Sequence, residues 1–138
     1  MLARSLLFAL LVAFVSAIPA TRRQEPGVND FNCKSSTQPF PVVLIHGLGA
    51  NKDNDLRGMQ SFLAQKGFCT FAITYGATPQ NPFNGGLRPI PDSSKQLSDY
   101  INTVASRTGA KKVDLVGHSE GGFMVSQYYL PLVGDFLF

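Results

Sequence analysis

The segment Gly117 to Gly121, Gly-His-Ser-Glu-Gly, has the pattern G-x-S-x-G, with a serine between two glycines. It follows an apolar run, Val113 to Val116, typical of a buried strand, and precedes a stretch from Gly122 to Leu130 typical of a helix. A serine at so sharp a strand-to-helix turn exposes its hydroxyl above the sheet, and flanking glycines leave room where the two elements nearly touch. The pattern predicts that Ser119 is a catalytic nucleophile. The alternative is a glycine-rich turn whose serine only caps the helix.

The elements around this turn alternate between strand and helix from residue 39 onward. Strands are expected at Val42 to Ile45, Phe68 to Tyr75 and Lys112 to Val116. Such an order, with right-handed crossovers, predicts one α/β domain over residues 39–138, built on a doubly wound, mostly parallel sheet.

Two helices are expected between these strands. The first runs from about Asp55 to Lys66, and a loop from Gly76 to Pro91 leads to the second, capped by Asp92 or Ser93 and ending before Gly109. Their periodicity places one apolar stripe on each helix: Leu56, Met59, Phe62 and Leu63 on the first, and Leu97, Ile101, Val104 and Ala105 on the second.

The amino terminus has the features of a secretory signal. Arg4 precedes an apolar run from Leu6 to Val15, and small residues lead up to Ala17. The run is well short of the roughly 20 apolar residues that a membrane span needs, so no stable membrane anchor is expected. We therefore predict a signal peptide over residues 1–17, cleavage after Ala17, and a secreted, extracellular protein.

Residues 18–38 are polar, charged and rich in proline, which predicts a tail or propeptide. Within it, Arg22 and Arg23 are either a dibasic processing site or two solvated side chains. The two cysteines, Cys33 and Cys69, are expected to form a disulfide in a secreted chain, worth about 4 kcal/mol in the chain-entropy model. The alternatives are two unpaired thiols or a partner outside this chain.

The net charge of +3 is small, and no basic stripe suggests nucleic acid as a partner. No metal-ligand cluster is recognisable in the sequence, and a hydrolytic serine would need no cofactor. The oligomeric state is left open by the sequence.

Three segments together resemble a known family: Pro41 to Gly49, Phe71 to Gly76 and Lys112 to Gly122. They are similar to the secreted triacylglycerol lipases and esterases of the α/β-hydrolase superfamily, in the class 2 lipase group. The resemblance implies an α/β-hydrolase fold, hydrolysis of acyl esters such as triacylglycerols, and a lipid or other acyl-ester substrate. The alternatives to this function are a non-catalytic secreted lipid- or acyl-binding protein on the same scaffold, or another serine hydrolase such as a thioesterase or peptidase.

The resemblance also implies roles for individual residues. Ser119 would accept the acyl group, while the backbone N–H groups of Leu48 and Glu120 would form the oxyanion hole. Both lie at carboxyl ends of strands, where open parallel sheets bind ligands. The first donor could shift by one position within Gly47 to Gly49. His46 is expected to orient this loop, and with it Gly47, by hydrogen bonding.

Neither histidine is expected to be the general base. The ring of His118 should project away from the Ser119 hydroxyl and pack beneath the turn. In the superfamily the triad acid and histidine follow the serine, and neither is recognisable before Phe138. The chain is thus expected to be the amino-terminal part of such a domain, truncated after the helix of the turn, with its third strand at an edge and almost inert alone.

Substrate contacts are less defined by the sequence. Tyr75, Phe83 and Leu87 could line an apolar groove for an acyl chain near the serine, or could be ordinary packing residues. The acyl chain length, the alcohol moiety and the presence of a lid are not predicted.

Overall fold

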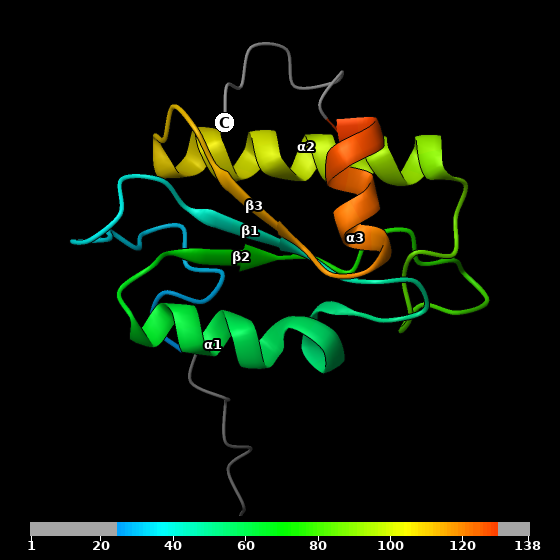
Figure 1. Ribbon diagram of the computed structural model, residues 1–138, viewed down its shortest axis with the longest axis horizontal. Coiled ribbons are helices and arrows are strands. Elements are labelled where there is room, and N and C mark those ends of the chain that lie inside the picture. The colour runs from blue at the N-terminus through cyan, green and yellow to red at the C-terminus, as the bar shows by residue number, and fades with distance from the viewer. Residues whose placement is uncertain (1–24, 130–138) are drawn as a thin grey trace, which may run out of the picture.

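The computed structural model describes residues 25–129 (Figure 1). The predicted signal peptide at 1–17 and the dibasic Arg22 and Arg23 lie outside the described residues. The described residues contain three strands and five helical segments, two of which (η1 and η2) are π-helical. In chain order they are β1 (Val42–Ile45), η1 (Lys52–Leu56), α1 (Arg57–Gln65), β2 (Thr70–Ala72), α2 (Ile90–Thr108), β3 (Asp114–Gly117), α3 (Glu120–Phe123) and η2 (Met124–Tyr129).

The strands form a parallel sheet in the order β2-β1-β3, with Val43 level with Phe71 on one side and Leu115 on the other. Helix α1 covers one face of this sheet, and α2 and α3 lie over the other (Figure 1). The prediction of a doubly wound parallel sheet is confirmed, and the first strand lies between the other two. Among the described strands β3 is an edge, and its Val116 is 39% exposed.

The central strand explains why its sequence is continuously apolar. Val43 and Ile45 point into a cluster that contains Leu97 and Ile101 of α2, whereas Val42 and Leu44 join the second cluster on the α1 side. All four side chains of β1 are therefore buried, because helices cover both faces. Burial of each such side chain contributes about 2 kcal/mol, which anchors the strand whose end carries the candidate site.

Helix α2 buries the predicted residues Leu97, Ile101 and Val104, but it begins earlier than expected. Its first residue is Ile90 and its N-cap is Pro89, so the prediction of a cap at Asp92 or Ser93 is wrong. The fixed φ of Pro91 suits a first helical turn, and this outweighs the capping preference of the polar side chains. The second strand is also shorter than the predicted Phe68 to Tyr75.

Helix α1 departs more from its predicted apolar stripe. Leu56 is buried, but Met59 and Phe62 are 50% and 55% exposed, so their predicted burial is wrong. The buried position one turn after Leu56 holds Gln60, whose amide Nε2 donates to the Thr70 carbonyl at 3.3 Å and to Asn29 Oδ1 at 3.2 Å. A polar residue is stable there because both hydrogen bonds replace those to water.

The described part of the predicted tail is attached to the sheet. Val28 bridges Thr70 in parallel, and Asn29 Oδ1 accepts a hydrogen bond from Ala72 N–H at 2.8 Å. The segment thus covers the outer edge of β2, which differs from the loose segment that its composition suggests. Whether residues 18–24 belong to a propeptide stays a prediction.

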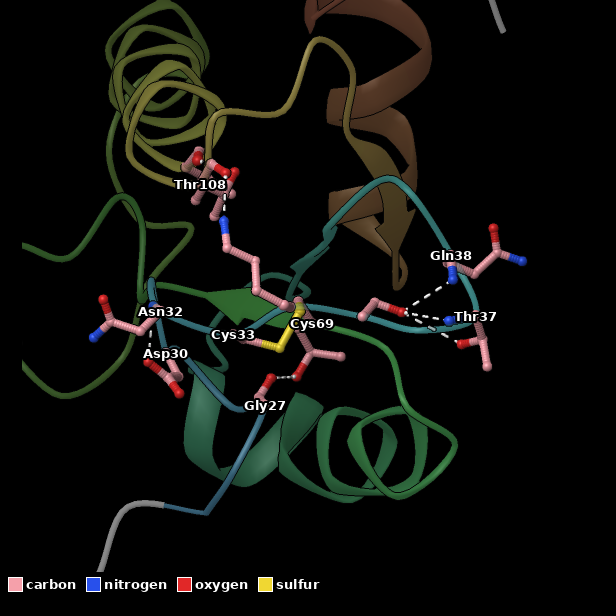
Figure 2. Close-up of a disulfide and its surroundings, with 12 residues drawn as sticks. Gly27, Asp30, Asn32, Cys33, Thr37, Gln38, Cys69 and Thr108 are labelled. Carbon is pink, nitrogen blue, oxygen red and sulfur yellow. Dashed lines mark hydrogen bonds between the residues drawn. A yellow bond between two sulfur atoms is a disulfide. The ribbon is translucent and has the colours of Figure 1, made fainter.

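The predicted disulfide is confirmed, because Cys33 and Cys69 are bonded to each other with their Cα atoms 5.8 Å apart (Figure 2). It joins the amino-terminal segment to the start of β2, next to the hydrogen bond from Thr70 Oγ1 to the Gly27 carbonyl. Within residues 25–129, no helix combines the length and the apolar character needed to cross a bilayer.

Candidate active site

Ser119 occupies the turn between β3 and α3, with a φ of 53° and a ψ of −119°. A positive φ is unfavourable for a residue with a side chain, and here it leaves Ser119 exposed at the start of the helix. A Cβ atom on Gly117 would lie 2.4 Å from the Gly121 carbonyl carbon, and one on Gly121 would lie 2.2 Å from the Ile45 carbonyl oxygen. The two glycines are therefore required by close backbone packing, as the sequence pattern predicts.

The loop after β1, which we call the oxyanion loop and define as residues 46–50, lies directly beside this serine. A Cβ atom on Gly47 would be 3.1 Å from the Ser119 Cβ. Gly47 N–H donates to Asp55 Oδ2 at 2.9 Å, and Gly49 N–H donates to the Gly85 carbonyl at 2.9 Å. Within the described residues the N–H of Leu48 has no such acceptor, and its side chain is 65% exposed.

Glu120 supplies the second free N–H group. It is the first residue of α3, so its N–H has no intrahelical acceptor, and no acceptor for it exists elsewhere in residues 25–129. The Glu120 and Leu48 N–H groups thus come from the two chain segments that meet at Ser119. Such groups can stabilise a negatively charged oxygen, with the helix dipole of α3 adding to the effect.

His46 is fully buried and stacks on the Tyr75 ring, with centroids 4.3 Å apart. Its Nε2 accepts a hydrogen bond from Tyr75 N–H at 3.1 Å, so the ring proton is on Nδ1, which donates to the Gly47 carbonyl at 2.8 Å. Burial lowers the pKa of His46, which favours this neutral form. The contact with Gly47 is the one required if His46 orients the oxyanion loop.

Tyr75 connects the end of β1 to α3 from inside the protein. Its hydroxyl lies 3.0 Å from the His46 carbonyl, to which it donates, and 3.3 Å from Glu120 Oε1. Burial, together with the Glu120 carboxylate, raises the pKa of Tyr75, so the phenol remains protonated. Because Tyr75 is fully buried, it is a packing residue, the alternative to a place in an acyl groove, whereas Phe83 and Leu87 are 79% and 42% exposed.

His118 does not pack beneath the turn as predicted. Its side chain is 66% exposed, and Nδ1 lies 2.8 Å from Asp55 Oδ1. Asp55, near the end of η1, holds the ring in this exposed position through that contact. No hydrogen bond joins His118 to Ser119 in the described part of the chain, which agrees with its ring lying away from the serine hydroxyl.

Asp55 is the residue of this site that the sequence did not reveal. It was expected at the start of a helix, and only the tertiary fold brings it to Gly47, 8 residues earlier, and to His118, 63 residues later. Burial alone would raise its pKa, but the hydrogen bonds from Gly47 and His118 outweigh burial and the pKa of Asp55 is lowered. A charged carboxylate therefore joins the two segments.

A parallel sheet, a serine on a strained turn and two free N–H groups define the α/β-hydrolase class. The lipase (class 2) family matches residues 39–130, and the chain belongs to this family. Its relatives include triacylglycerol lipases from Burkholderia plantarii (30% identical over 132 residues, 91% of this chain and 35% of the relative), Pseudarthrobacter phenanthrenivorans (33% over 94 residues, 64% and 27%) and Vibrio cholerae (33% over 89 residues, 60% and 25%). The chain thus spans about a quarter to a third of these relatives' length.

Proposed function

We propose that this chain contributes the nucleophile and the oxyanion hole of a serine hydrolase of the lipase and carboxylesterase type. The observation that carries the proposal is the geometry at Ser119, where an exposed hydroxyl on a strained turn lies beside two N–H groups that have no acceptor within residues 25–129. Membership in the class 2 lipase family supports an acyl ester as the substrate.

In the proposed reaction, Ser119 Oγ attacks the ester carbonyl carbon and loses its proton to a general base. The carbonyl oxygen becomes an oxyanion that accepts hydrogen bonds from the N–H groups of Leu48 and Glu120. Collapse of this intermediate breaks the bond to the alcohol, which leaves with the proton. Water then attacks the acyl-enzyme in the same manner and releases the carboxylic acid.

We do not assign the general base to either histidine of the described residues. His46 is buried with both ring nitrogens engaged, so it cannot take the serine proton. His118 makes its hydrogen bond to Asp55 instead of Ser119. Residues 25–129 are therefore expected to hydrolyse esters very poorly without a further histidine as the base.

A lipid substrate is supported by the apolar side chains around the oxyanion loop. Asn51 Nδ2 donates to the Phe83 carbonyl at 2.9 Å, and Gly85 N–H donates to the Ala50 carbonyl, so the loop carrying Phe83 is attached to the oxyanion loop. Phe83 and Leu48 are largely exposed on these two joined loops. We propose that they contact the acyl chain.

The test compares two serine variants of the protein made from its complete coding sequence. Ser119→Ala should remove hydrolysis of a p-nitrophenyl ester while leaving the thermal unfolding midpoint nearly unchanged, because the lost hydroxyl is exposed. Ser126→Ala is the matched control, since Ser126 is also exposed and its hydroxyl donates a hydrogen bond to the Phe123 carbonyl. Full activity in Ser119→Ala would contradict the proposal and favour an acyl-binding or differently catalysed protein.

We also propose that the protein is secreted. The signal-like residues 1–17 and the Cys33–Cys69 disulfide support this, because disulfides persist mainly in oxidising compartments. Amino-terminal sequencing of material from the culture medium should begin at Ile18 or later. Retention of Met1 on that material would contradict the cleavage.

A further inference from the structure

Asp55 makes two contacts that no other described side chain combines. Its Oδ2 accepts from Gly47 N–H at 2.9 Å, in the oxyanion loop, and its Oδ1 accepts from His118 Nδ1 at 2.8 Å, next to the nucleophile. The side chain is only 16% exposed, so water competes weakly for these hydrogen bonds. One carboxylate therefore connects the two segments that supply the proposed oxyanion donors.

The position of this carboxylate is fixed by its own segment. The η1 turn is capped by Asn51, whose side chain accepts from Asp53 and Asn54 N–H at 2.9 Å, while Asn54 Oδ1 accepts from Asn51 N–H at 3.0 Å. Leu56, the next residue after Asp55, is buried in the core on the α1 side. Asp55 is thus presented from a capped and anchored turn instead of a loose loop.

We propose that Asp55 is a positioning residue that locks the oxyanion loop against the nucleophile turn and so sets the distance between the Leu48 N–H and Ser119. The inference rests on the proposed function of these two residues. Gly47 directly precedes Leu48, and its α-carbon approaches Ser119 so closely that a Cβ there would lie 3.1 Å from the serine Cβ. Any movement of Gly47 would therefore displace the Leu48 donor.

The experiment uses the protein made from its complete coding sequence and compares Asp55→Ala with Asp55→Asn and Asp53→Ala. Asparagine can still accept from Gly47 N–H through Oδ1 and donate from Nδ2 to His118 Nδ1 in the ring tautomer that leaves Nδ1 unprotonated, so it should restore most of the function. Asp53 is the matched control, because it is exposed on the same turn and its carboxylate contacts only Lys52 among the described residues. All variants are compared well below their unfolding midpoints.

Two measurements are made on each variant. Asp55→Ala should lower kcat for a p-nitrophenyl ester by about tenfold or more with little change in KM, because a displaced oxyanion donor affects the transition state most. It should also accelerate hydrogen exchange of the Gly47 amide, measured on a peptide covering residues 46–51. Asp53→Ala should match the wild type, and Asp55→Asn should lie close to it, in both measurements.

The two arms separate this inference from the proposed function. If the wild type does not hydrolyse the ester, the proposed function fails, and Gly47 exchange still decides whether Asp55 holds the loop. Unchanged Gly47 exchange in Asp55→Ala would overturn the inference in either case. So would an active wild type whose kcat is unaffected by Asp55→Ala, or an Asp55→Asn variant as impaired as Asp55→Ala in both measurements.

Discussion

The sharpest structural prediction concerns Gly121, where helix α3 meets the end of β1. A Cβ atom at this position would lie 2.2 Å from the Ile45 carbonyl oxygen and 2.9 Å from the His46 carbonyl oxygen. Both neighbours are backbone atoms of the central strand and its end, so neither can rotate away. Atoms inserted into a packed site lower the free energy of unfolding by about 1–3 kcal/mol. Because the neighbours here are backbone atoms, Gly121→Ala should lower it by about 3 kcal/mol.

Gly122→Ala is the control for this prediction. Its Cβ would meet the nearest backbone atom, the Gly117 carbonyl oxygen, at 3.5 Å, which is ordinary contact. Because glycine is unfavourable inside a helix, this change should be neutral or stabilise by about 0.5–1 kcal/mol. In urea, with a slope of about 1–3 kcal/mol/M, the unfolding midpoints should differ by at least about 1 M. Equal midpoints would refute the close approach of α3 and β1.

Three further predictions concern stability. Replacing Cys33 and Cys69 with serine should lower the free energy of unfolding by about 4 kcal/mol, and the unreduced denatured wild type should show no alkylated thiol in residues 25–129. Because burial lowers the pKa of His46 below 6.5, stability should be full above pH 6.5 and fall as the pH drops below it; a flat unfolding free energy between pH 7 and 5 would contradict this. Asn29→Ala should lower the free energy of unfolding by about 2 kcal/mol, because Ala72 N–H loses its acceptor and alanine is strained at a φ of 51°. An unchanged thermal unfolding midpoint would contradict this.

The parts of this fold that the sequence predicts are those governed by local periodicity. The continuous apolar run of β1 and the α2 stripe were recognisable because each repeats at the period of its element. The turn at Ser119 was equally clear, since its glycines are required by contacts between neighbouring elements. The cysteine pairing was also foreseen, from the compartment implied by the amino terminus.

The parts that the sequence did not reveal depend on contacts between distant segments. Gln60 is buried on α1 because its amide donates to Asn29 Oδ1 and to the Thr70 carbonyl, whereas the neighbouring Met59 is exposed. Asp55 reaches the oxyanion loop only after η1 has folded back over the end of β1. Neither outcome has a periodic signal, so a pattern that sorts residues by hydrophobicity assigns these positions incorrectly.

The central claim is that Ser119 is the nucleophile, and covalent labelling tests it most directly. The protein made from its complete coding sequence is treated with a fluorophosphonate, digested, and analysed by mass spectrometry for the modified peptide. The account predicts one adduct on Ser119, absent from Ser119→Ala and retained in Ser126→Ala. An active protein whose adduct lies on another residue, or that still hydrolyses esters after Ser119→Ala, would contradict it.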